Sequence, residues 1–390
     1  MPKLEPWARL RGAGGEGDAS SVRPPDLSLK GIVKWTLTLP GTGHASCVEW
    51  GRFWFTCTAD PVSGVHMLHG IDSVKKTIAW TIKSPFSTYH RHDFNTFASS
   101  TPAVGQAGGV ALIPSGNAEL QLIGFSYTGQ KRWAIDLGKF PTQHGYGASP
   151  VISGNVAIAA AEPDFAMGGI IAVNVLTGKI LWHHKRLSAD APYAAPLVTK
   201  INGKDTVVVP STAFGLTALD LLSGEMIWQL KQTPFTQRCV GAVTRSGDML
   251  IVTTGSGAGA RLAIGFQLQD AGPPVQKWSL NRATSYVPTP LIIGSDALFW
   301  GDNGVLLRVN STSGTTVYQE RISDNVFASP IHMQGAILNI TRKGEIVRVS
   351  DQLRPQPVEL LPLGEESHAS LSVFANQLVA RTLSKVHVLG

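Results

Sequence analysis

A short motif recurs along this chain of 390 residues and restricts its fold more than any other feature of the sequence. The motif is a turn, usually with glycine, then two or three intervening residues, then tryptophan and an alternating strand pattern. Successive tryptophans are 45 to 53 residues apart, and a repeat of about 40 to 50 residues is typical of propellers and other repeat architectures. A seventh copy, GTTVYQERI at 314, has Tyr318 in the aromatic place, and an eighth, PQPVELLPL at 355, has lost the aromatic residue. The tryptophans are Trp35, Trp80, Trp133, Trp182, Trp228 and Trp278.

Between these copies, a run of small residues leads into a strand eight times. The entries read GHASCV, FASSTPAV, YGASPVI, YAAPLV, VGAV, YVPTPLI, FASPIHM and SHASLSV. Each is followed by a hairpin-like pair of strands and then by the next copy of the aromatic motif, so each repeat has four strands. The 41 glycines, 24 prolines and only 15% charged residues also favour many short strands over helices. The sequence therefore predicts an all-β fold, an eight-bladed β-propeller of four-stranded antiparallel blades.

The two ends of the repeat region predict how the ring closes. Residues 31–390 supply eight blades of 45 residues, but the last entry has only three strands before Gly390. The missing outer strand is GIVKWTLTLP, at about 31–40, which stands alone before the first entry. Pairing it with the last blade removes an open sheet edge. We therefore expect a single propeller domain over 31–390 after an extended leader over 1–30, with each tryptophan packed between adjacent sheets.

The Gly-x-x-x-Trp copies, the ASP and STP entries and the eight blades resemble the PQQ-like β-propeller repeat family, the superfamily of quinoprotein alcohol dehydrogenases. The leader PWARLRGAGGEGDAS is similar to a glycine-rich Trp-x-x-x-Arg leader in a branch of secreted bacterial members. The family contains redox enzymes and also the non-catalytic lipoprotein BamB of the outer-membrane barrel assembly machinery, which is similar in size and blade count. The resemblance implies the periplasm or cell envelope, although the start MPKLEPWARLRG has no apolar signal-peptide segment.

Quinoprotein dehydrogenases of this superfamily hold a quinone (PQQ) and a calcium ion in the axial funnel, often under a disulfide between adjacent cysteines. Here Cys47, Cys57 and Cys239 include no adjacent pair. The acidic residues near the entries match no calcium-binding motif; they are Asp93, Asp324, Glu365 and Glu366. We therefore predict no cofactor. Cys47 and Cys57 can bond across a hairpin if its register pairs positions that sum to 104, whereas a sum of 103 points them to opposite faces.

Other patterns indicate no further function. GAGGEG at 12–17 has the letters of a dinucleotide-binding loop but follows no strand and opens no helix. His183 and His184 are neighbours on one strand, so they point to opposite faces. The net charge is +6, but the basic clusters are short and do not indicate nucleic acid. No apolar run has the length of a membrane helix. A single propeller domain can exist alone, and we expect a monomer.

The loops that cross from one blade to the next gather polar and aromatic residues at one face of the predicted ring. HRHD at 90–93 lies in one such loop, and further histidines lie in the corresponding loops of neighbouring blades. Tyrosines, Phe327 and an arginine come from the opposite side of the ring. The resulting channel mouth is predicted to bind a small anionic or sugar-like ligand. Its candidate residues are His44, His90, His92, Asp93, His144, Tyr193, Arg238, Tyr286 and His368.

Three classes of function stay open. The leading hypothesis is a non-catalytic scaffold that binds protein partners through its disc faces and blade edges. The second is a quinone- and calcium-dependent dehydrogenase. The third is a carbohydrate-active enzyme, with a metal held by His90, His92 and His144 or with a His and Tyr pair as acid and base. Polar residues also gather in loops without binding anything, so a hydrated channel mouth needs no ligand.

Overall fold

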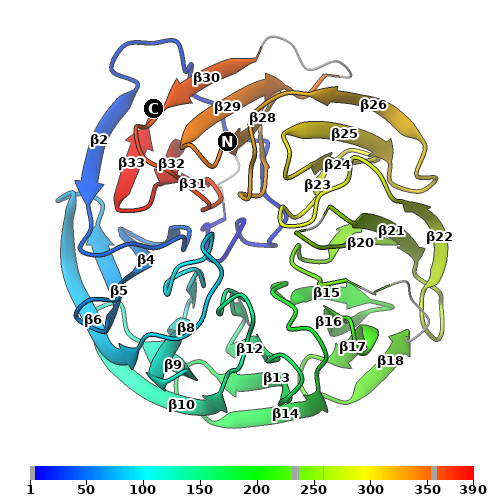
Figure 1. Cartoon of the computed structure of the whole chain (residues 1–390), viewed down its shortest axis with the longest axis horizontal. Coiled ribbons are helices and arrows are strands. Elements are labelled where there is room, and N and C mark those ends of the chain that lie inside the picture. The colour runs from blue at the N-terminus through cyan, green and yellow to red at the C-terminus, as the bar shows by residue number, and fades with distance from the viewer. Residues whose placement is uncertain (1–4, 231–234, 236, 258, 353–357) are drawn as a thin grey trace.

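The computed structural model describes residues 5–230, 235, 237–257, 259–352 and 358–390. Four-stranded antiparallel sheets stand around a central axis as the blades of a propeller (Figure 1). There are eight such blades. The first two are joined into one eight-stranded sheet by a short parallel pairing of Phe86 and Ser87 with Gly116 and Asn117. The predicted eight-bladed, all-β architecture is confirmed.

The strands run from the axis to the rim in chain order in the first seven blades, and in the last blade β2 from the start of the chain is the outer strand. The blades are β3 (Val48–Trp50), β4 (Phe53–Asp60), β5 (Val65–Asp72) and β6 (Thr77–Ser87); β7 (Ala103–Gly105), β8 (Gly108–Asn117), β9 (Glu119–Phe125) and β10 (Lys131–Lys139); β11 (Val151–Ser153), β12 (Val156–Ala161), β13 (Met167–Asn174) and β14 (Ile180–Leu187); β15 (Leu197–Ile201), β16 (Lys204–Ser211), β17 (Gly215–Asp220) and β18 (Met226–Leu230); β19 (Thr244–Ser246), β20 (Met249–Gly255), β21 (Arg261–Gln267) and β22 (Val275–Leu280); β23 (Leu291–Ile293), β24 (Asp296–Trp300), β25 (Val305–Asn310) and β26 (Thr316–Arg321); β27 (Ile331–Met333), β28 (Ala336–Ile340), β29 (Glu345–Ser350) and β30 (Glu359–Pro362); and β31 (Ser372–Phe374), β32 (Gln377–Arg381), β33 (Lys385–Leu389) and β2 (Val33–Thr38).

The burial of each strand follows from its place in the blade. The second and third strands are covered by neighbouring blades on both faces, so they are continuous apolar runs such as VAIAAA in β12, which is buried throughout. The outer strands have one solvated face, and β2 alternates between half-buried and exposed residues. No helix in the described ranges is long and apolar enough to cross a membrane.

The ring closes as the sequence predicts. β2 pairs antiparallel with β33, with Val33 opposite Leu389 and Trp35 opposite Val388, and completes the last blade as its outer strand. Residues 355–357 of the eighth, degenerate motif copy lie outside the described residues; the copy continues into β30 at the outer edge of the seventh blade.

The recurring glycine and tryptophan form one joint between neighbouring blades. The Trp182 indole N–H of the third blade donates to the carbonyl oxygen of Leu221 in the fourth, and the next motif glycine, Gly224, packs on the Trp182 ring in a left-handed conformation. The predicted packing of tryptophan between sheets is confirmed at this joint. The same arrangement recurs for Trp80 with Tyr127 and Gly129, Trp133 with Val175 and Gly178, and Trp278 with Ser311 and Gly314.

The leader lies inside the ring, a position for which the sequence provides no signal. Figure 1 shows this dark blue segment crossing the centre before the chain runs out to β2. Trp7 is buried in the core, and its carbonyl accepts the N–H of Glu49 beside the axis. Arg11 donates to the carbonyl oxygens of Pro290 and Pro330 at 3.0 and 3.3 Å. β1 (Asp18–Ala19) then pairs parallel with the inner strand β27, which holds the leader against the inside of the ring.

The register of the first hairpin decides the cysteine question. Val48 lies opposite Phe55 and Glu49 opposite Trp54, so paired positions sum to 103. Cys47 and Cys57 therefore point to opposite faces of the first blade and are free, buried thiols. Cys239 is also free and buried, and burial raises the pKa of all three.

Candidate functional site

The small-residue entries form a ring of hydrogen bonds around the axis. The backbone N–H of Ser46 donates to the hydroxyl of Thr101 in the next blade at 2.9 Å, and the N–H of Thr101 donates to Ser149 at 3.0 Å. The ring is interrupted at Ala195 and Ala242, which have no hydroxyl to accept the N–H of the preceding blade. The remaining bonds run from Ala242 to Thr289 at 3.0 Å, from Thr289 to Ser329 at 2.9 Å and from Ser329 to Ser370 at 2.9 Å.

Two positions before this ring, one residue of every blade faces the axis. These residues line a cavity of about 620 Å³, which we call the funnel, and Leu10 of the leader is also in its lining. Because the entries repeat around the axis, the same position places a different side chain on each sector of the wall. The eight residues are His44, Ser99, Gly147, Tyr193, Val240, Val287, Phe327 and His368.

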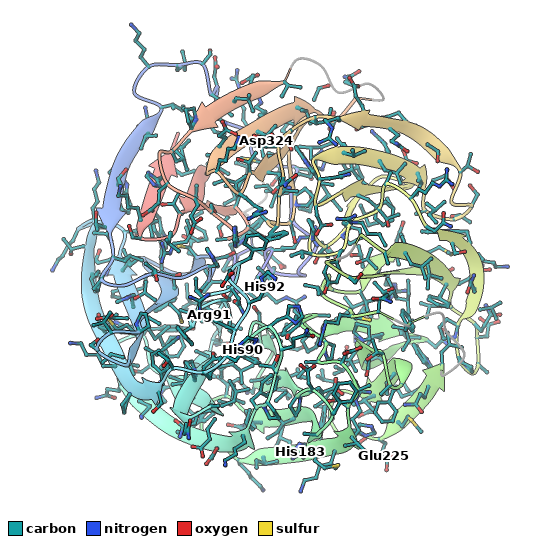
Figure 2. All side chains as sticks on the ribbon, viewed as in Figure 1. His90, Arg91, His92, His183, Glu225 and Asp324 are labelled. Carbon is teal, nitrogen blue, oxygen red and sulfur yellow. The ribbon has the colours of Figure 1, made fainter. Side chains whose placement is uncertain are left out.

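Four of the five predicted histidines reach the funnel, in two pairs. The rings of His44 and His368 are 4.1 Å apart between centroids, and those of His92 and His144 are 5.4 Å apart and nearly parallel. His90 is exposed and is not part of the lining; Figure 2 shows His92 at the edge of the central opening and His90 farther out. The proposed trio of His90, His92 and His144 is therefore not brought together.

Three imidazoles of the funnel, those of His44, His144 and His368, have a lowered pKa and are neutral near pH 7. Burial holds the pKa of His44 well below its usual value and lowers the pKa of His368 to about 4. Burial also lowers the pKa of His144, with the Arg238 charge as a second cause. His368 Nδ1 lies 2.9 Å from the carbonyl oxygen of Phe94. Since a carbonyl only accepts, this nitrogen donates, and Nε2 of His368 is left as an acceptor.

The other predicted residues divide between the funnel and its surroundings. Tyr193 and Tyr286 line the funnel, and the Tyr193 hydroxyl is 2.7 Å from that of Thr142. Arg238 does not line it, because its guanidinium forms ion pairs with Asp164 at 2.7 Å and Asp190 at 3.2 Å. Asp93 is exposed and also outside the lining.

Sequence reasoning missed a second group of funnel residues, which come from the turns between the second and third strands of the blades. These turns reach the same face as the crossover loops, so their place in the repeat is the signal that identifies them. Arg342 lies in the turn between β28 and β29, and its guanidinium carbon is 3.7 Å from the Phe94 ring centroid and 4.8 Å from that of Phe327. Asp302 and Asn303 come from the corresponding turn of the sixth blade.

The donor set of the funnel does not fit a calcium ion. Calcium takes about six to eight oxygen ligands, with carboxylates among them. Asp302 is the one carboxylate among the described lining residues. It is already occupied by the N–H groups of Tyr286 and Val287, at 2.7 and 3.0 Å, and by Arg261 at 3.3 Å. In the described ranges no three His, Cys, Asp or Glu side chains group as metal ligands.

Two of the acidic residues noted near the entries have other partners. Asp324 forms an ion pair with Lys343 at 2.6 Å, at the position labelled in Figure 2. Glu365 accepts hydrogen bonds from the N–H of Ser384 at 2.9 Å and from the hydroxyl of Thr382. Neither lines the funnel.

The fold and the funnel define the class: this is a PQQ-like β-propeller. A family model described as outer membrane protein assembly factor BamB matches residues 69–320, more than half of the chain. The chain therefore belongs to the BamB family of PQQ-like propellers, and the resemblance seen in the repeats is confirmed.

Individual relatives agree with this assignment. The outer membrane protein assembly factor BamB of Moranella endobia is 23% identical over 253 residues, which are 63% of this chain and 60% of that protein. The crystal structure of BamB from Moraxella catarrhalis has a TM-score of 0.64 and 15% identity, covering 91% of this chain and 97% of that one. A europium-containing methanol dehydrogenase has a TM-score of 0.66 and 9% identity, covering 98% and 91%. At these identities the two solved structures show the shared fold alone.

Proposed function

We propose that this chain is a non-catalytic scaffold of the cell envelope that binds a protein partner at the outer edge of its third and fourth blades. Membership of the BamB family supports the envelope and the scaffold role, since the relatives it matches are called outer membrane protein assembly factors. The observation that carries the binding surface is a group of exposed apolar side chains on this part of the rim.

This group, the rim patch, lies on two neighbouring outer strands and the turns before them. The exposed fractions of its side chains range from 40% to 69%, which is high for large apolar residues. The equivalent positions before the aromatic residue are Lys131 and Arg132 in the second blade and Gln276 and Lys277 in the fifth. The apolar character is therefore not a property of the repeat itself. The rim patch consists of Leu176, Ile180, Leu181, Leu222, Met226 and Ile227.

The two halves of the rim patch are neighbours in space. The joint between Trp182 and Leu221 connects β14 with the turn before β18. Figure 2 places His183 of β14 and Glu225 of that turn close together on the rim. The apolar side chains of the third and fourth blades therefore form one surface.

The backbone beside the rim patch is also open. β14 and β18 are the last strands of their sheets, so among the described residues their outward N–H and C=O groups have no strand partner. An unpaired edge next to apolar side chains suits the addition of an extended segment of another protein, in which main-chain hydrogen bonds supply affinity and the side chains supply selectivity. An extended, apolar protein segment is the partner that we propose.

Site-specific photo-crosslinking in the native host tests this surface. A photoreactive phenylalanine analogue at Met226 is expected to form one defined adduct with an envelope protein. The matched control is Val317, an apolar position on β26 of the sixth blade with 41% exposure. The adduct should disappear when Leu181→Lys and Leu222→Lys are added. The same adducts from Met226 and Val317, or an adduct that persists with both lysines present, would exclude the rim patch as the binding surface.

The redox alternative is tested separately. Because Asp302 is already occupied by two backbone N–H groups and Arg261, we expect no quinone-dependent dye reduction after the protein is incubated with PQQ and calcium. Dye reduction that requires both additions would replace the scaffold proposal with a dehydrogenase.

A further inference from the structure

We infer that the funnel binds a small carboxylated sugar, with Arg342 as the partner of its carboxylate. The funnel and the rim patch are different surfaces, and neither proposal depends on the other. A volume of about 620 Å³ is within the range of small-molecule sites.

Arg342 supplies an uncompensated positive charge. No carboxylate lies within 4.0 Å of its guanidinium in the described part of the chain, and its Nε atom is buried without a hydrogen-bond partner. The other arginine of the lining, Arg261, is paired with Asp302. With Arg342 unpaired and Arg261 balanced by Asp302, the lining therefore carries a net positive charge. The guanidinium carbon lies over the rings of both Phe94 and Phe327, and these contacts restrict its position; the planar fork of an arginine favours two parallel hydrogen bonds to a carboxylate.

The Ser and Thr hydroxyls in the ring of hydrogen bonds around the axis supply donors for a ligand. Five hydroxyls of the ring each accept the N–H of the preceding blade, and their own protons have no acceptor among the described residues. A hydroxyl has one proton to donate, so each is left with a donor for a ligand oxygen. These hydroxyls, all in the lining of the funnel, belong to Thr101, Ser149, Thr289, Ser329 and Ser370.

The rest of the wall suits the ring of a sugar better than a bare anion. His44 is 9% exposed, and its Nδ1 is buried without a partner, although the ring contacts that of His368 at a tilt of 30°. Nε2 of His368 is an acceptor for a ligand hydroxyl. The aromatic rings of Phe94, Phe327 and Tyr286 supply apolar faces for the C–H side of a sugar ring. A single anion would use Arg342 and leave these groups unpaired.

Calorimetric titration with D-glucuronate tests the inference on the full chain. We expect D-glucuronate to bind, and glucose, acetate and inorganic phosphate each to bind at least about tenfold more weakly. Arg342→Gln should weaken D-glucuronate binding by about tenfold or more. Arg342→Lys keeps the charge but not the planar fork, so its affinity should lie between those of the unmodified protein and Arg342→Gln. The matched control is Arg52→Gln in the turn between β3 and β4, outside the lining of the funnel; it should bind as the unmodified protein does.

Three results would overturn the inference. The first is no binding of D-glucuronate at about 10 mM. The second is unchanged binding in Arg342→Gln, with folding verified by circular dichroism. The third is equal binding of phosphate or of glucose, which would remove the sugar or the carboxylate from the recognised ligand. Lysines in the rim patch should leave D-glucuronate binding unchanged, so failure of one proposal is distinguishable from failure of the other.

Discussion

The indole Nε1 of Trp182 in the third blade donates a hydrogen bond to the carbonyl oxygen of Leu221 in the fourth blade, over 3.0 Å. The turn that presents this carbonyl also places Gly224 directly on the indole ring. One side chain therefore joins two sheets through a polar contact and an apolar contact. Because the joint recurs around the ring, a change in one motif affects the neighbouring blade as well as its own.

Gly224→Ala should destabilise the protein more than an alanine at another left-handed glycine. An alanine Cβ at 224 would lie 2.4 Å from Trp182, and the backbone φ is +72°. Gly203 has a φ of +78° with nothing within 4 Å, so Gly203→Ala isolates the conformational cost, about 1–2 kcal/mol. Overpacking should add about 1–3 kcal/mol at 224. Urea unfolding measures both, and equal losses would show that the ring accommodates the methyl group.

Trp7→Ala should lower the free energy of unfolding by about 3–5 kcal/mol, because the side chain is 2% exposed inside the ring. Leu29→Ala, at 57% exposure in the same leader, should cost little. A larger loss for Trp7→Ala than for Leu29→Ala shows that the leader is docked in the ring. If the two variants unfold at the same urea concentration, the leader does not contribute to the stability of the ring.

Glu162→Ala should cost about 3–5 kcal/mol, because it leaves a buried guanidinium without its partner. Arg186 bonds Glu162 at 2.5 and 2.7 Å and also donates to Thr217 of the fourth blade. The double variant Glu162→Leu with Arg186→Met should recover much of the loss, because no unpaired charge is left. Equal urea midpoints for the single and double variants would contradict this explanation.

The contact between Asp18 and His332 should make leader docking depend on pH. Burial alone would lower the pKa of His332, but the carboxylates of Asp18, at 3.6 Å, and Asp351, at 2.9 Å, raise it above 6.5. The contact with His332 lowers the pKa of Asp18 to about 2. The histidine contribution is complete below pH 6.5 and disappears as pH rises through the raised value. The aspartate contribution is complete above pH 3.8 and disappears as pH falls towards 2.

Thermal unfolding of the unmodified protein and of Asp18→Asn checks this window. The difference in melting temperature should be larger at about pH 5.5 than at about pH 9, where His332 loses its charge. A difference that is the same at both pH values would mean that the contact is not a charge interaction.

The fold was predictable because the spacing of the tryptophans, the small residues that lead into the strands and the aromatic positions all indicate the same four-stranded repeat. Trp35 identified the closing strand, because a lone outer strand at the start matches a three-stranded blade at the end. The site was predictable only to the level of a loop. His92 and His90 differ by two positions in an irregular crossover, where no periodicity specifies direction, and only His92 reaches the funnel. Arg238 meets Asp164 from a distant loop, and the docked leader has no repeat at all, so neither contact leaves a local signal.

The pairing of Val33 with Leu389 has a consequence for the time at which the molecule can become complete. β2 is synthesised before any of the blades, but its partner β33 is synthesised after the other seven blades. Until then β2 has no sheet to join, and the last blade cannot form. The final closure must therefore follow the synthesis of β33, and joining such distant segments is entropically slow. During this interval the apolar faces of the first and last blades are exposed, and this is when the chain most needs protection from aggregation.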